Sequence, residues 1–458
     1  MTFSTSIFLI GLLPWFVIAY NMLGKGNIWT RSIILILANC LFIIWGGLAS
    51  FLMLTVGAVL VWIFSAVIFQ KRTKWVLALC LFLTSMPLVL MKYTRFAIAN
   101  INALMGSDIQ VSPIVVPMGI SFVTFEAISL LADIYKGKIE RCPNIIETYL
   151  YLTFFPTISS GPIIRFNEFE TGLKRKSFSC DFPAAIERIV FGLSKKILIA
   201  DKLAILVDYY YDGVSAGFNY SAIGLWLGSI AYTLQLYFDF SGYSDMAIGI
   251  GQLLGFDIRE NFAAPYQASS ISMFWKRWHM SLTQWFRDYI YIPLGGNRCS
   301  AARHIVNMLI VWLLTGLWHG ADWSFLIWGI GYFVLLVAEK YIPAMTKMIK
   351  GIPGHIYTLF FVNLLWVPFR ANNLNTTAAY IRGMFGGGIA SLENRAVRFI
   401  PLIVLACLLC FQWNGVLERV SKNIGFRIIR GIAFIAIAFV TLCAALNSSY
   451  APYIYGNF

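Results

Sequence analysis

Charged side chains are scarce in this chain. Only 12% of its 458 residues are Asp, Glu, Lys or Arg, whereas a soluble domain carries about 25%. Hydrophobic residues make up 59% of the sequence, and the mean hydropathy is +0.73. Apolar runs recur along the whole length. This composition excludes a soluble protein and predicts a polytopic membrane protein.

The features of a cleavable leader are also missing. The first apolar run, near residues 6–23, has no basic segment before it and no small-residue cleavage site after it. We therefore expect it to be a first membrane span. The net charge of +14 comes from basic residues in the gaps between apolar runs. This distribution follows the positive-inside rule, so the charge does not predict nucleic-acid binding.

Cysteine spacing gives no sign of a metal site. The eight cysteines are scattered, and only Cys407 and Cys410 have the spacing of a metal or redox pair. This pair lies among leucines within an apolar run, where small apolar core residues are the better interpretation. The sequence predicts neither a bound metal nor a bound cofactor.

Apolar runs long enough to cross a bilayer, about 20 residues each, predict 11–12 transmembrane helices. Basic connectors follow every odd crossing, which places both termini outside. The segments near 145–160 and 243–256 do not fit this alternation, and we expect re-entrant or buried helices there. The Trp-rich stretch 255–303 predicts interfacial amphipathic helices. The candidate spans are 6–23, 31–50, 51–69, 75–91, 113–133, 186–207, 221–240, 305–319, 322–340, 352–370, 397–413 and 428–447.

Two of the four histidines stand beside tryptophans in very apolar sequence. His279 follows Trp278, and His319 follows Trp318. An ionisable group at membrane depth is costly, which favours a functional site facing a cavity or the protein interior. Histidine titrates near neutral pH and suits a general base. The other two, His304 and His355, lie at predicted loop edges and are interpreted as ordinary interfacial side chains.

Other polar groups interrupt apolar sequence. The block 237–245 places Asp239, Ser241 and Asp245 at the end of a predicted span, and Arg165 follows a Gly-Pro break. Site groups are one interpretation, while ion-pair or helix-terminus groups are an equally good one for Asp245 and Arg165. Glu126, within a predicted span, is better interpreted as a satisfied buried carboxyl than as a catalyst.

Two long motifs carry a family resemblance. The segment 277–298 (RWHMSLTQWFRDYIYIPLGGNR) and the segment 316–323 (GLWHGADW) strongly resemble the membrane-bound O-acyltransferase (MBOAT) family. Within it, they are similar to the branch of bacterial alginate O-acetyltransferases. Phe155-Pro156, the segment 161–165 and the block 237–245 match as well, and the resemblance extends over the whole chain. Asp322 stands where this branch has Asn, a nearly isosteric change.

The resemblance implies an all-α helical funnel formed by a single membrane domain, residues 1–458. It makes His319 the catalytic histidine and His279 the second active-site histidine. A cytosolic donor, acetyl-CoA or a carrier-protein thioester, would meet an acceptor arriving from outside, in a bacterial inner membrane. Expected donor-binding or supporting residues are Trp278, Trp318, Lys276, Arg277, Arg165, Asp239, Ser241, Asp245 and Asn297.

The C-terminal tail, residues 448–458, ends in an aromatic pattern. Tyr453, Tyr455 and Phe458 resemble an ending seen in this branch, in which the tyrosine carries the acyl group. Composition alone favours an interfacial aromatic belt, whereas the resemblance favours Tyr455 as the acyl carrier. The sequence contains no hydrolase-like domain, so we expect a separate extracytoplasmic SGNH-hydrolase-like transferase to pass the acyl group to a polysaccharide.

Two alternative functions remain open. A lipid or protein acyltransferase of the same superfamily would share the motifs but would not need the tyrosine tail. A membrane transporter would move an intact solute without an acylated intermediate. Many secondary transporters contain internal repeats, and the lack of a repeat in this sequence counts against that alternative.

Overall fold

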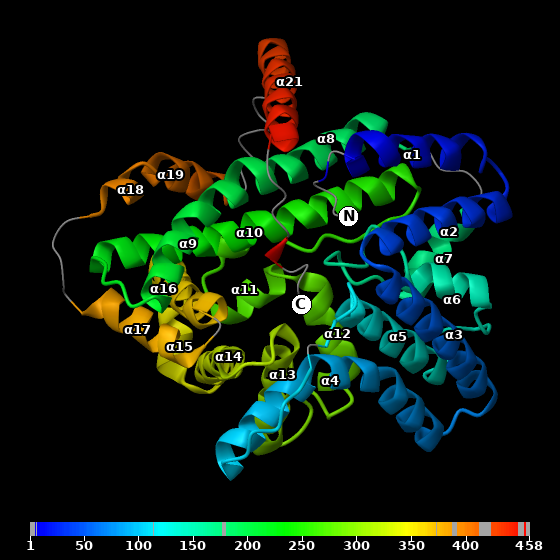
Figure 1. Ribbon diagram of the computed structural model, residues 1–458, viewed down its shortest axis with the longest axis horizontal. Coiled ribbons are helices and arrows are strands. Elements are labelled where there is room, and N and C mark those ends of the chain that lie inside the picture. The colour runs from blue at the N-terminus through cyan, green and yellow to red at the C-terminus, as the bar shows by residue number, and fades with distance from the viewer. Residues whose placement is uncertain are drawn as a thin grey trace. The chain divides into compact units, whose positions relative to one another are not determined.

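The computed structural model describes residues 5, 7–112, 114–175, 180–371, 373–386, 392–411, 423–447 and 453–454. Within these ranges, all regular secondary structure is helical, so the predicted all-α class is confirmed (Figure 1). The chain gathers into two compact units that interleave along the sequence. Unit 1 contains residues 1–189, 244–259 and 452–458, and unit 2 contains residues 190–243 and 260–451.

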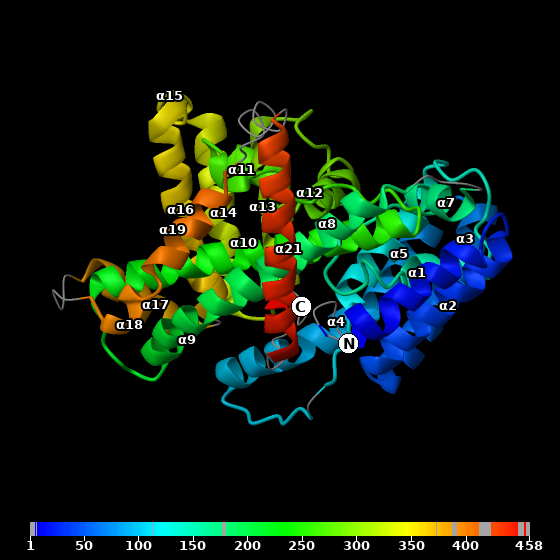
Figure 2. The same ribbon diagram turned by 90° about the horizontal axis from the view of Figure 1, so that it is seen from above.

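Helices of unit 1 come from the first part of the chain. They are η1 (Ile7–Leu12), α1 (Leu13–Met22), α2 (Ile28–Trp45), α3 (Leu48–Gln70), α4 (Lys74–Met105), α5 (Ile120–Tyr135), α6 (Ile145–Leu152) and α7 (Phe166–Lys174). Helices α2, α3 and α6 pack against one another, and α5 packs against α3 and α4 (Figures 1 and 2). Gly119 starts α5 with φ +75°, and a Cβ there would lie 2.3 Å from the carbonyl oxygen of Ile158.

Unit 2 contains most of the later helices. They are η2 (Lys195–Ala200), α9 (Asp201–Ser215), η3 (Pro265–Gln267), α11 (Ile271–Arg277), α12 (Met280–Phe286), η4 (Arg287–Tyr291), α13 (Ala301–His319), α14 (Trp323–Tyr341), α15 (Pro343–Met348), α16 (Gly351–Ala371), α17 (Leu374–Phe385), α18 (Asn394–Val397), α19 (Ile400–Leu409) and α21 (Ile424–Asn447). Helices α8 (Phe182–Ser194) and α10 (Ala222–Leu253) contribute residues to both units.

Two glycines bring α13 and α14 into close contact. A Cβ at Gly316 would lie 2.5 Å from the carbonyl oxygen of Phe325, and one at Gly329 would lie 2.5 Å from that of Trp312. Larger residues would therefore push the two helices apart. Helix α16 also packs against α14. This three-helix group positions the end of α13, where His319 lies.

Seven helices in the described part of the chain are long and apolar enough to cross a membrane. They are α2, α3, α4, α13, α14, α16 and α21. The apolar segments Ile7–Met22 and Ile400–Leu409 are shorter. The protein is therefore a multi-span membrane protein, as its composition predicts.

The largest difference from the predicted spans is α10. The sequence predicts a span at 221–240 and a separate buried segment at 243–256, whereas the structure has one continuous 32-residue helix. Ser241 and Gly242 do not end it. A Cβ at Gly242 would lie 2.6 Å from the carbonyl oxygen of Gly192, so this glycine permits close helix packing. The polar block 237–245 thus lies within a helix, and its predicted place at the end of a span is wrong.

Other boundaries also differ. The predicted span 186–207 is three consecutive pieces, α8, η2 and α9, with a π-helical turn at Lys195–Ala200. The helix predicted from residue 113 begins at Ile120, and the one predicted to end at residue 91 continues to Met105. The segment 145–160 contains the short helix α6 and is largely buried, in agreement with the prediction of a buried helix.

Candidate active site

His319 is the last residue of α13 and is enclosed by aromatic rings. Its side chain is 1% exposed. The rings of Trp318, Trp328 and Phe369 lie edge-on to the imidazole, at centroid distances of 4.6, 4.9 and 4.9 Å. The following residue, Gly320, has no space for a side chain, because a Cβ would lie 2.0 Å from the Phe325 ring. Packing at this helix end therefore favours glycine directly after His319.

His279 lies at the break between α11 and α12 and is also 1% exposed. Its backbone has φ +43°, a left-handed conformation that is uncommon outside glycine. Backbone bonds on both sides hold the break in place. The Ala263 amide donates to the Arg277 carbonyl at 3.0 Å, and the Met280 amide donates to the Asn261 carbonyl at 2.9 Å. Burial lowers the pKa of His279 to about 3, so its imidazole is neutral at physiological pH.

The ring of Trp318 lies close to the rings of both histidines. Its ring centroid lies 4.6 Å from that of His319 and 6.1 Å from that of His279. Phe240 of α10 closes the other side of His279, at 4.6 Å. The two histidines predicted from widely separated motifs therefore belong to one aromatic cluster in unit 2. Trp278, also predicted, packs within the same unit on Trp366 at 5.3 Å.

Two cavities in unit 2 are lined by residues of the predicted donor-binding stretch. One, of about 440 Å³, is lined by Trp275, Lys276, Arg287 and Trp312, among others. The second, of about 630 Å³, shares Lys276 and Trp312 and is also lined by the predicted Asn297. The exposed Lys276 ammonium thus borders both cavities, whereas Arg277 is half-buried and lines neither.

His304 is not an ordinary interfacial side chain, so that prediction is wrong. It is buried in the first turn of α13 and lines the 630 Å³ cavity. One ring nitrogen, Nε2, lies 2.8 Å from the Tyr291 hydroxyl, and the other, Nδ1, lies 2.6 Å from the Tyr341 hydroxyl. His304 therefore joins η4, α13 and α14 beside the cavity. The sequence carried no signal of this, because both partners depend on the folded arrangement.

The predicted carboxylates of α10 form ion pairs. Asp239 is buried and lies 2.7 Å from the Lys196 ammonium, which also lies 2.7 Å from Asp201. Asp245 pairs with Arg188 at 3.0 Å, in agreement with its interpretation as an ion-pair group. Ser241 is buried on the same helix.

Arg165 belongs to unit 1 and directly precedes α7. Its backbone amide donates to the Glu168 carboxylate at 3.4 Å, and its guanidinium interacts electrostatically with the buried Glu126. Tyr455 lies outside the described residues, as does most of the tail 448–458. Tyr453 is described; it is buried, and its hydroxyl lies 4.0 Å from the Met246 sulfur within unit 1.

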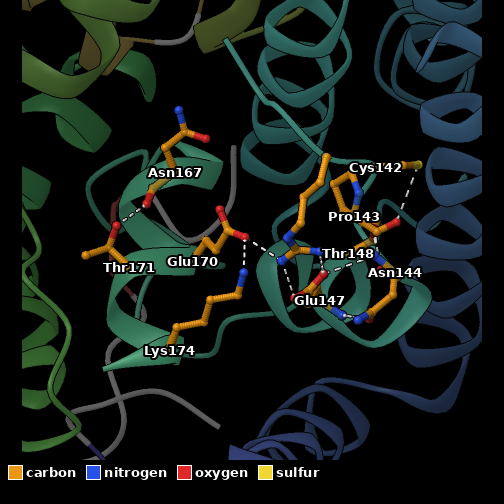
Figure 3. Close-up of polar contacts among 10 residues, drawn as sticks. Cys142, Pro143, Asn144, Glu147, Thr148, Asn167, Glu170, Thr171 and Lys174 are labelled. Atoms are coloured by element: carbon orange, nitrogen blue, oxygen red, sulfur yellow. Dashed lines mark hydrogen bonds and ion pairs between the residues drawn. The ribbon is translucent and has the colours of Figure 1, made fainter. Parts of the chain in front are cut away.

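A charged network joins α6 and α7 in unit 1 (Figure 3). The Arg141 guanidinium donates to the Glu147 carboxylate at 2.8 Å and also bonds to Glu170. Glu170 accepts a further bond from Lys174 at 2.6 Å. Glu147 and Asn144 form a capping box at the start of α6. These charges stabilise one another and the helix terminus.

Comparison of the sequence with known proteins identifies the family of this chain. Residues 40–378 match the model of MBOAT, the membrane-bound O-acyltransferase family. A probable alginate O-acetylase of Pseudomonas syringae is 36% identical over 90% of this chain and 81% of its own length. One of Pseudomonas putida is 34% identical over both full lengths. A peptidoglycan O-acetyltransferase of Helicobacter pylori is 32% identical over 92% of this chain and 84% of its own. The chain therefore belongs to the membrane-bound O-acyltransferase family and is an acyltransferase.

Proposed function

We propose that this protein moves an acetyl group from a cytosolic thioester to the C-terminal Tyr455, for O-acylation of an extracytoplasmic polysaccharide in a bacterial cell envelope. A separate soluble SGNH-hydrolase-like transferase would complete the transfer. The observation that carries the proposal is the pairing of two buried histidines, His279 and His319, around Trp318. The names of the relatives, alginate and peptidoglycan acetylating enzymes, support a polysaccharide acceptor.

The donor side of the reaction is assigned to the two cavities of unit 2. Lys276 borders both, and Arg287 borders the smaller one. These cations suit the phosphate groups of acetyl-CoA or of a carrier-bound phosphopantetheine. Trp275 and Trp312, whose rings lie 4.9 Å apart, give the smaller cavity an apolar wall suited to the uncharged thioester arm.

His319 acts as the general base in this proposal. It accepts the proton as the tyrosine oxygen attacks the thioester carbonyl, the C–S bond breaks, and the proton is returned to the departing thiolate. A thiol has a pKa of about 8.5 and a phenol one of about 10, so transfer from thioester to aryl ester costs little. Full proton transfer from tyrosine to a free histidine would span about 3.5 pKa units. Removal of the proton during attack avoids that state.

The role of Tyr455 rests on the sequence of the tail, because this residue lies outside the described part of the structure. Tyr455→Phe keeps the ring and removes the nucleophile. We expect loss of surface O-acylation at normal membrane abundance, while Tyr453→Phe, the matched control, retains it. In a strain without the soluble transferase, mass spectrometry of the C-terminal peptide should find the acyl group on Tyr455. An active Tyr455→Phe variant would exclude the relay.

His319→Ala tests the base separately. We expect acyl transfer to fall by about 10²–10⁴-fold, while His355→Ala, whose ring contacts the Ala268 carbonyl at 3.2 Å, retains it. Near-normal activity in His319→Ala would refute the assignment.

Deletion of residues 453–458 distinguishes the proposed function from the lipid or protein acyltransferase alternative. An enzyme whose acceptor enters laterally would keep its activity without the tail. Solute flux without any acylated intermediate would identify a transporter.

A further inference from the structure

Asn261 is a polar contact of His279 that was not identified from the sequence. Its side-chain oxygen Oδ1 lies 3.2 Å from Nδ1 of His279. The same oxygen accepts bonds from the Ser281 backbone amide at 3.1 Å and from the Ser281 hydroxyl at 2.9 Å. Asn261 is buried, so these bonds are shielded from water.

The orientation of the Asn261 amide follows from its partners. A backbone amide can only donate, so the atom that faces Ser281 N must be the oxygen and not the NH₂ group. That oxygen can only accept. The nitrogen Nδ1 of His279, which faces the same oxygen, must therefore carry a proton. In the neutral imidazole this leaves Nε2 with the lone pair.

The backbone of Asn261 acts on the same residue. Its carbonyl accepts the Met280 amide at 2.9 Å, directly after His279. Asn261 therefore holds the uncommon left-handed backbone of His279 as well as its ring. Phe240 and Trp318 restrict the imidazole from two further directions, at 4.6 and 6.1 Å. A ring flip would replace Nδ1 by the Cδ2–H group at the amide oxygen and would turn the Nε2 lone pair away from its present direction.

The geometry points to Asn261 as the positioning residue of the acyl-transfer site: it fixes His279 as the Nδ1–H tautomer and thereby makes Nε2 its proton-accepting nitrogen. This inference rests on the proposed function, because it assigns a chemical role to the tautomer. It gives His279 a defined acceptor atom for a hydroxyl or thiol proton, in addition to the base at His319. Asn261 acts through its bonds to His279 and to the start of α12.

The tautomer is measurable in the intact protein. With only four histidines in the chain, ¹⁵N-histidine labelling of the full-length protein in lipid nanodiscs gives a simple spectrum, and the loss of signals in His279→Ala assigns His279. Protonated and unprotonated ring nitrogens have well-separated ¹⁵N chemical shifts. We expect His279 to be protonated at Nδ1 and unprotonated at Nε2. The opposite tautomer in the wild-type protein would overturn the inference without requiring any variant of Asn261.

Three variants connect the tautomer to the reaction. Asn261→Leu removes the acceptor, and we expect the Nδ1–H signal to weaken and acyl transfer to fall at least about tenfold. Asn261→Asp restores an acceptor oxygen, and we expect it to keep Nδ1 protonated and to recover most of the activity. Ser281→Ala removes a neighbouring bond to the same oxygen but spares the imidazole, so it should change neither readout.

The outcomes distinguish a failure of the assignment of Asn261 from a failure of the proposed role of His279. If Asn261→Leu keeps both the tautomer and the activity, Asn261 is not the positioning residue. If Asn261→Leu does not reach the membrane, the wild-type spectrum and the Asn261→Asp rescue still decide. If the tautomer is as expected but His279→Ala transfers acyl groups normally, the role of His279 in the proposed function fails, while the structural assignment of Asn261 stands.

Discussion

The charged network at α6 and α7 of unit 1 and the histidine cluster of unit 2 hold their ionisable groups in opposite ways. At α6 and α7 of unit 1, Arg141, Glu147 and Glu170 are held by one another, and Arg141 keeps 42% of its side chain exposed. In unit 2, the imidazoles of His279 and His319 are almost fully buried, and aromatic rings form their nearest walls. The first arrangement keeps charges ionised, and burial in the second keeps the His279 imidazole neutral.

This difference bears on which polar groups are suited to proton transfer. A paired, partly exposed charge has its interactions satisfied and has little tendency to exchange a proton. A neutral imidazole between aromatic rings retains a lone pair, and burial opposes its protonation by water. The contrast therefore predicts that substitutions in the histidine cluster of unit 2 change acyl transfer, whereas substitutions in the charged network of unit 1 change stability alone.

The largest effect is expected from the aromatic wall itself. Trp328 is 0% exposed and contacts His319 at 4.9 Å, as well as Trp366 and Phe369. Trp328→Ala should lower the free energy of unfolding by about 3–5 kcal/mol and abolish acyl transfer. The matched control is Trp15→Ala, since Trp15 is 69% exposed. Thermal unfolding and acyl transfer in nanodiscs measure both quantities, and equal effects of the two substitutions would contradict the importance of the wall.

His279→Ala should have the next largest effect. It removes a neutral proton acceptor while the surrounding rings remain, so we expect acyl transfer to fall about 10²-fold with normal membrane abundance. The pKa of about 3 in the folded protein lies below the unfolded value of about 6.5. Between these two pH values the unfolded state binds a proton at His279 that the folded state does not bind. The free energy of unfolding therefore decreases as pH falls from about 6.5 towards 3. The free energy of unfolding should therefore differ less between pH 7 and pH 5 in His279→Ala than in the wild-type protein.

Glu147→Gln tests the other side of the comparison. Burial opposes ionisation of Glu147, but its bonds to Arg141 and to the Asn144 amide outweigh burial and hold the pKa below its usual range. Its contribution to stability is therefore present above the unfolded pKa of about 4.3 and is lost as pH falls through the folded value. We expect a loss of about 1 kcal/mol at pH 7 and unchanged specific activity.

The control for Glu147→Gln is Glu140→Gln, because Glu140 is an exposed carboxylate near the same loop. It should be neutral in urea or thermal unfolding at both pH values. A strong loss of specific activity in Glu147→Gln, with the fold intact, would mean that the charged network takes part in the reaction and that the two units do not differ as described.

The smallest effect belongs to Lys174→Ala. Lys174 pairs with Glu170 four residues earlier on α7, and 43% of its side chain is exposed. Pairs of this kind contribute about 0.2–0.5 kcal/mol and are screened by salt. Unfolding at low and high ionic strength should show a small loss that disappears with added salt, and acyl transfer should be unaffected. A loss that persists in high salt would indicate packing by the aliphatic stem.

The sequence allowed prediction of those parts of the site that depend on local pattern. His279 and His319 stand in long motifs, and the structure places both around Trp318. Their partners were not predictable, because Asn261 and Tyr341 reach the histidines only through the fold. Helix type was predictable from hydropathy, but the continuity of α10 was not. Polar residues in its middle are accommodated by ion pairs such as Asp239 with Lys196, which no local pattern reveals.

Helix α4 carries two lysines whose spacing can be compared with the thickness of a bilayer. Basic residues end at Lys74 and resume at Lys92, 18 positions later on the same helix, which at about 1.5 Å per residue corresponds to about 27 Å. The hydrocarbon layer of a bilayer is about 30 Å thick. The spacing of the two lysines along α4 is therefore close to the thickness of that layer. The apolar stretch between these lysines thus suits a bilayer of ordinary thickness.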